Sequence, residues 1–183
     1  MADVQRVGAR YWESNPPSPG IFINYRYVDI MAAVALDELL IPRFGEGAIF
    51  RADRSLRKGE LYKEALFEAV ACASILLVII GSNWSQSLIE GKHDWVLLEL
   101  SEAKEYRVPI LPVFMTRIHN EHTAEMKWSP VERCLEQITK DTLPPGVPCD
   151  LLDGERVTFG TATPKEDAWR LTEAIGRLAP MLS

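Results

Sequence analysis

The sequence predicts an α/β domain built on a parallel β-sheet, and three observations support this fold class. Short apolar runs of strand composition alternate along the chain with segments of helical periodicity. One run, Ile75–Ile80, contains only Ile, Leu and Val, as expected of a strand buried on both faces of a parallel sheet. The third observation is the regular β-α-β order, which right-handed crossovers turn into parallel strands.

Five short segments have the apolar, β-branched composition of strands, and they alternate with amphipathic helices. The helix ending the chain is expected to begin with Thr163 as N-cap and Pro164 at the first helical position. Asp37 interrupts the apolar pattern of the first helix. The predicted strands are 21–25, 48–51, 74–80, 108–114 and 155–159; the predicted helices are 29–41, 59–73, 94–106 and 163–182, with room for one more at 130–140.

Five parallel strands in this order indicate a flavodoxin-like three-layer sandwich with the strand order 2-1-3-4-5 and helices on both faces. Such sheets bind ligands beyond the carboxyl ends of their strands, near the switch point between strands 1 and 3. A functional site is therefore expected in the loops that follow Tyr25, Arg51, Ile80 and Phe114.

The chain has 183 residues, of which 47% are hydrophobic, enough for one domain with a full core. The stretch "SNPPSPG" indicates a linker, so residues 1–19 are expected to form an arm and residues 20–183 the domain. With 20 basic and 26 acidic residues, the surface does not favour nucleic-acid binding.

No segment has the length of a membrane span, and residues 1–19 lack the apolar core of a signal peptide. The three cysteines show no close spacing and are interpreted as reduced thiols in a cytoplasmic protein. The phosphate-binding motif G-x-x-x-x-G-K-[ST] is absent. His119 and His122 lack the further ligands of a zinc site, so no metal is expected.

Glu99 occupies an unusual position in the helix at 94–106. It falls on the apolar stripe formed by Val96, Leu100 and Ala103, whereas Asp94 and the other charged residues of this helix fit an exposed face. A carboxylate on such a stripe is costly unless it is paired, hydrogen-bonded or at the edge of a pocket. The residues alone leave two explanations open: an ion pair with a Lys or Arg, or a functional acid.

Five segments resemble, in order and spacing, the conserved boxes of Toll/interleukin-1 receptor (TIR) domains, particularly those of bacterial members. Three positions depart from the usual pattern: Asn24 replaces a serine, Tyr27 an arginine, and Leu97 a residue that is often arginine in bacterial members. The segments are "IFINYRYVD" (21–29), "IFRADRSLRKGELYKEAL" (49–66), "SILLVIIGSNWSQS" (74–87), "DWVLLEL" (94–100) and "VPILPVF" (108–114).

This resemblance implies an enzyme that cleaves the nicotinamide–ribose bond of NAD+, giving ADP-ribose or a cyclic isomer, without a cofactor or metal. Glu99 lies where enzymatic TIR domains carry their catalytic glutamate. The resemblance also implies head-to-tail self-association through the so-called BB loop, and a role in bacterial antiviral defence. The implied substrate-binding residues are Tyr25, Arg26, Trp84 and Trp95, and the implied assembly residues are Arg54, Arg57 and Lys58.

Two other functions remain open at this point. A non-catalytic TIR domain would use the same loop only to recruit partners. A generic nucleotide-binding flavodoxin-like domain would be revealed by tight flavin binding, although the missing phosphate loop disfavours it. Incubation with NAD+ and an assay for nicotinamide would separate the enzyme from both.

Overall fold

The protein is described by a computed structural model, which covers residues 20–52, 62–81, 84, 94–115, 147, 151, 153–160 and 164–182. In this part of the chain, the core is a five-stranded sheet with the order β2-β1-β3-β4-β5, and every neighbouring pair is parallel. The predicted strand order is therefore confirmed. The strands are β1 (Ile21–Asn24), β2 (Ile49–Phe50), β3 (Ile75–Ile80), β4 (Ile110–Met115) and β5 (Val157–Phe159).

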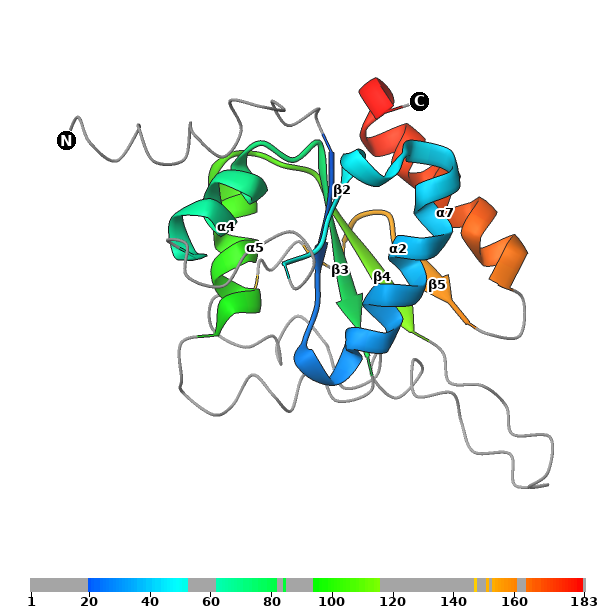
Figure 1. The fold of residues 1–183 in the computed structure, drawn as a ribbon, viewed down its shortest axis with the longest axis horizontal. Helices are drawn as coiled ribbons and strands as arrows, with labels where there is room; N and C mark the ends of the chain where they lie inside the picture. The colour runs from blue at the N-terminus through cyan, green and yellow to red at the C-terminus, as the bar shows by residue number, and fades with distance from the viewer. Residues whose placement is uncertain are drawn as a thin grey trace.

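Helices cover both faces of the sheet, which confirms the three-layer sandwich (Figure 1). One apolar cluster joins the sheet to α4 (Tyr62–Ala71) and α5 (Trp95–Glu105). A second cluster joins the opposite face to α2 (Ile30–Phe44) and α7 (Pro164–Leu178). All six residues of β3 are buried between the two layers, because this strand lies at the centre of the sheet.

Asp37, which breaks the apolar pattern of α2, is almost fully buried and pairs with an arginine. Its Oδ2 lies 3.2 Å from Nη1 of Arg51, the residue that follows β2. The pair ties the middle of α2 to the carboxyl end of the edge strand. Removing one partner of such a buried pair typically costs about 3–5 kcal/mol, because the other charge is left uncompensated.

The largest differences from the predicted helix ends are in α2 and α7. Helix α2 extends through Pro42 to Phe44 and stops at Gly45, whose φ of 85° is easily reached only by glycine. Helix α7 begins at Pro164 as predicted but ends at Leu178, and a separate 3₁₀ turn follows at Pro180–Leu182. Pro180 explains the early end, because proline cannot donate the next helical hydrogen bond. Residues 1–19, Thr163 and the segment 130–140 lie outside the described residues.

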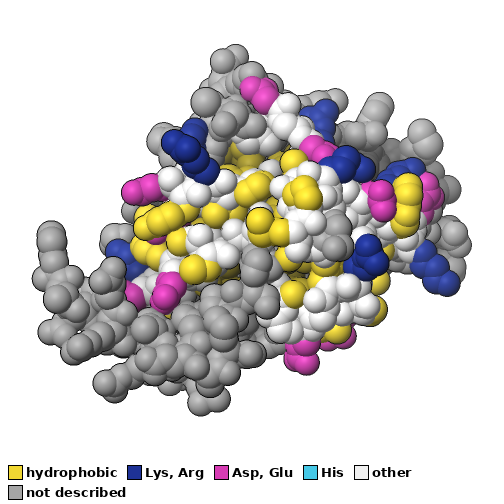
Figure 2. All heavy atoms as spheres, turned by 90° about the horizontal axis from the view of Figure 1, so that it is seen from above, with side chains coloured by type: hydrophobic (Ala, Val, Ile, Leu, Met, Phe, Trp, Pro, Cys, Tyr) yellow, Lys and Arg dark blue, Asp and Glu magenta, His cyan; other side chains and the backbone are white. Residues whose placement is uncertain are grey.

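The strands run from the top to the bottom of Figure 1, so their carboxyl ends lie at its lower side. From the opposite side, where the strands begin, hydrophobic side chains form a broad area with charged groups mainly at its margins (Figure 2). No helix among the described residues has the length and apolar character needed to cross a membrane.

Candidate active site

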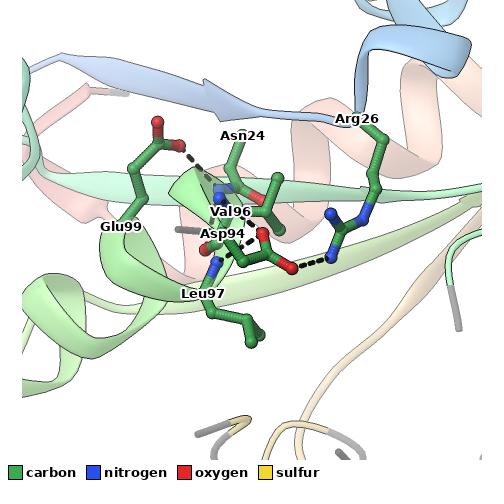
Figure 3. Close-up of polar contacts among 6 residues, drawn as sticks. All are labelled: Asn24, Arg26, Asp94, Val96, Leu97 and Glu99. Carbon is green, nitrogen blue, oxygen red and sulfur yellow. Dashed lines mark hydrogen bonds and ion pairs between the residues drawn. The ribbon is translucent and has the colours of Figure 1, made fainter. Parts of the chain in front are cut away.

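Glu99 lies on α5 at the carboxyl end of β1 and is held there by a buried amide. It is 7% exposed, and Asn24, the last residue of β1, is fully buried. Nδ2 of Asn24 donates a hydrogen bond of 2.6 Å to Oε2 of Glu99 (Figure 3). Among the described residues, the Glu99 carboxyl contacts this amide rather than a Lys or Arg side chain.

Burial raises the pKa of Glu99 to about 8. The hydrogen bond from Asn24 lowers this pKa, whereas the negative charge of Asp94 raises it further. The carboxyl group is therefore mostly protonated at neutral pH in the free protein. A strongly perturbed acid at the carboxyl edge of a parallel sheet is a candidate functional group, because structural acids are rarely buried without a cation.

The first turn of α5 is fixed by Asp94, which the sequence analysis had placed on an exposed face. This residue is the N-cap: its Oδ1 accepts hydrogen bonds from the backbone N–H groups of Val96 (3.1 Å) and Leu97 (3.4 Å). Its Oδ2 forms an ion pair of 2.6 Å with Nη2 of Arg26, two residues after β1. Both side chains are mostly buried, so the expectation of an exposed Asp94 was wrong. The capping requirement of a helix N-terminus explains its position.

Arg26 was predicted to bind the substrate, and in this structure its guanidinium group faces Asp94 (Figure 3). The Nε of Arg26 is buried without a hydrogen-bond partner among the described residues. Arg26 thus joins the end of β1 to the start of α5. A substrate phosphate would have to compete with Asp94 for it.

A second acid approaches the carboxyl end of β3. A Cβ atom added to Gly81, the residue after β3, would lie 2.0 Å from Oδ1 and 2.6 Å from Cγ of Asp29. Burial raises the pKa of Asp29, and the nearby Arg26 lowers it. A larger residue at position 81 would therefore force the Asp29 side chain or the backbone to move. Asp29 was not among the candidates predicted from the sequence, although an acid soon after the first strand of a parallel sheet is a recognisable signal.

The three aromatic candidates occupy different environments. Trp95 is 39% exposed and lies one turn before Glu99 on α5, as predicted. Trp84 is completely buried in the cluster beneath α4 and α5, and its indole N–H has no partner among the described residues. Tyr25 is half-buried and packs against the cluster under α2 and α7. Trp95 is therefore the aromatic candidate that combines an exposed surface with a position beside Glu99.

The remaining sequence candidates cannot be placed. Arg54, Arg57 and Lys58, the predicted assembly residues, lie outside the described residues, as do His119 and His122. Within the described part of the chain, no group of three or more His, Cys, Asp or Glu side chains could hold a metal ion.

No protein-family model and no curated protein matches the chain. Solved structures do match, among them one titled "Structure of the activated Roq1 resistosome directly recognizing the pathogen effector XopQ (TIR domains)". That match is 18% identical, covers 89% of this chain and 84% of the other, and has a TM-score of 0.43. A structural similarity this low does not assign a function to the chain. The fold assignment rests on the strand order and pairing described above.

Proposed function

We propose that this protein is a TIR-type NAD+ glycohydrolase, with Glu99 as its catalytic residue. The observation that carries the proposal is the buried Glu99 carboxyl at the carboxyl end of β1, which is hydrogen-bonded to an amide rather than paired with a cation among the described residues. The resemblance of the surrounding segments to TIR domains supplies the substrate class. The edge of the sheet where ligands bind in this fold supports the location.

The cleavage chemistry suits a single acid. The bond between the nicotinamide nitrogen and C1′ of the ribose breaks, and its electron pair leaves with nicotinamide, which becomes neutral. The ribose acquires oxocarbenium character, as in glycoside hydrolysis, and a carboxylate beside it stabilises the positive charge. Water then attacks C1′ and loses a proton to give ADP-ribose. Attack by a nucleophile of the same molecule gives a cyclic isomer instead.

The ionisation of Glu99 is coupled to substrate binding in this proposal. The free carboxyl is mostly protonated at neutral pH, since its pKa is raised to about 8. The nicotinamide ring of NAD+ carries a positive charge, and a nearby cation favours the ionised form of an acid. NAD+ binding should therefore release a proton from Glu99 and form the carboxylate that the reaction needs. Trp95, beside it, is proposed to form one wall of the pocket.

We further propose that the enzyme self-associates head to tail, with Arg54, Arg57 and Lys58 of one copy contacting the next. Contacts of this type are heterologous and can extend into filaments. The support is the resemblance of the segment 49–66 to a BB loop and the acidic net charge of −6 on the whole chain. A role in antiviral defence belongs to the same proposal.

A second function, a non-catalytic assembly domain, is favoured by one observation. Tyr27, Val28 and Met31 follow β1 and are 85%, 63% and 74% exposed, and such exposed apolar groups are typical of interaction surfaces. The deciding experiment is a product profile from NAD+ at high protein concentration. The enzyme should release nicotinamide together with ADP-ribose or a cyclic isomer; self-association without nicotinamide release would instead support the assembly domain.

A further inference from the structure

The amide of Asn24 contacts α5 at two acceptors that lie three residues apart on one face of the helix. Nδ2 donates to Oε2 of Glu99 at 2.6 Å and to the backbone carbonyl of Val96 at 3.3 Å. Asn24 is fully buried at the end of β1, where its backbone pairs with β3 at Val78. The side chain therefore connects the central part of the sheet to the functional face of α5 (Figure 3).

The two contacts also fix which way the amide faces. If the amide were flipped, its oxygen would lie against the Val96 carbonyl oxygen, which has no hydrogen to donate. Only the NH₂ group has two hydrogens to donate to both. A serine hydroxyl, which TIR domains usually have at this position, has a single hydrogen and a shorter side chain. Asn24 can thus make a double contact that a serine cannot.

We propose that Asn24 is the positioning residue for Glu99: its amide holds the carboxyl in one orientation against α5 and stabilises the carboxylate when the substrate is bound. The catalytic consequence of this inference rests on the proposed function. The contact between Asn24 and Glu99 does not depend on it. The bond of 2.6 Å should strengthen when Glu99 is ionised, because it then becomes charge-assisted. The neighbouring charges are Asp94 on α5 and Arg26, which pairs with Asp94; on α4, Lys63 acts on Glu102 of α5.

The contact can be tested in the unaltered protein. In ¹⁵N-labelled protein, the side-chain NH₂ resonances of Asn24 should shift with pH, following the ionisation of Glu99 at a midpoint near 8. The same resonances should show no such titration in Glu99→Gln, and they should keep their titration in Glu105→Gln, a matched change at an exposed position of α5. NH₂ resonances that do not respond to pH in the unaltered protein would overturn the proposal.

The catalytic consequence is tested with Asn24→Asp, which keeps the shape of the side chain but replaces the donor by an acid. Two carboxyl groups in contact cannot both ionise, so the pair should hold a proton well above the pH at which Glu99 alone loses it. We expect kcat for nicotinamide release to fall roughly a hundredfold, as for other misplaced catalytic groups, with little change in KM. Asn24→Ser should retain part of the activity because it keeps one donor.

The outcomes separate this inference from the proposed function. If the protein releases no nicotinamide from NAD+, the proposed function fails, and the titration of the Asn24 amide still decides whether Asn24 contacts Glu99. If nicotinamide is released and Asn24→Asp keeps an unchanged kcat and pH profile, Asn24 does not position the catalytic acid and the inference is overturned. Thermal unfolding of each variant shows whether a loss of kcat reflects a loss of fold.

Discussion

Arg26 and Asp94 form an ion pair of 2.6 Å between the segment after β1 and the N-cap of α5. The second connection between the same two elements is the hydrogen bond from Asn24 to Glu99. Helix α5 is therefore attached at its N-cap, Asp94, to the segment after β1, and at Glu99 to the last residue of β1. This double attachment fixes the orientation of Glu99 relative to the edge of the sheet at which ligands bind.

The charge of Asp94 can be removed without removing the helix cap. Asp94→Asn keeps an oxygen that accepts from the N–H groups of Val96 and Leu97, since Asn and Asp are comparable N-cap residues. The change removes a negative charge that raises the pKa of Glu99, so this pKa should fall. The rise of kcat/KM with pH should move to lower pH in the variant. An unchanged pH profile would show that Asp94 does not influence the reacting acid.

Glu99 should also make the stability of the protein depend on pH. Its pKa is about 8 in the folded protein and 4.5 ordinarily, so the folded state holds a proton that the unfolded chain has lost between these values. This contribution to stability is complete below pH 4.5, the ordinary pKa, and is lost as the pH rises through the folded-state pKa of about 8. The expected loss is about 1.4 kcal/mol of unfolding free energy per pH unit within that window.

Denaturant unfolding of the unaltered protein and of Glu99→Gln across this window measures the contribution of Glu99. Glutamine does not ionise, so the difference in unfolding free energy between the two proteins should change with pH and become constant above about 8. Glu105→Gln, on the exposed side of the same helix, should show no comparable change in slope. If the difference in unfolding free energy is independent of pH, folding does not raise the pKa of Glu99.

The close approach of Asp29 to Gly81 predicts that replacing this glycine by a larger residue destabilises the protein. Gly81→Ala would place a methyl group 2.0 Å from Oδ1 of Asp29, so the Asp29 side chain or the backbone must move. We expect a loss of about 1–3 kcal/mol of unfolding free energy, as for other overpacked sites. The double variant Gly81→Ala/Asp29→Ala should recover much of this loss, which a double-mutant cycle measures. Equal stability of Gly81→Ala and the unaltered protein would refute the close contact.

Self-association should control activity if the loop around Arg57 and Lys58 connects neighbouring copies. The specific activity should then rise with protein concentration or crowding, because we propose that the loop of one copy completes the site of the next. Reversing both residues to Glu should reduce this rise, since the basic loop would no longer match an acidic chain with a net charge of −6. Light scattering and nicotinamide release on the same samples test this. Constant specific activity in a protein that stays monomeric would contradict it.

The fold followed from the sequence because its signals are local. Strand β3 is apolar throughout and α5 has helical periodicity, so each could be predicted from its own residues. Glu99 was found for the same reason, as an acid on an apolar stripe. Its partner Asn24 was noted only as a departure from the TIR pattern, because the two residues are 75 positions apart and no periodicity relates them.

The environments of Asp94 and Trp84 could not be predicted from the sequence for related reasons. Asp94 looked exposed because its helical position was considered without its role as N-cap, and its pairing with Arg26 spans 68 positions. Trp84 seemed available to a substrate because it follows a strand, yet the apolar cluster encloses it completely. Side-chain direction at the end of a strand depends on the packing of distant elements, which sequence spacing does not contain.

Glu99→Gln, assayed for both NAD+ cleavage and stability, tests the central claim most directly. Glutamine keeps the size of the side chain and an oxygen that can accept from Asn24, but it has no charge to stabilise the ribose cation. We expect kcat for nicotinamide release to fall roughly a hundredfold to a thousandfold, with little change in KM, and the melting temperature at pH 8 to be maintained or raised. A variant that cleaves NAD+ at the full rate but melts at a lower temperature would contradict the account, because Glu99 would then be structural.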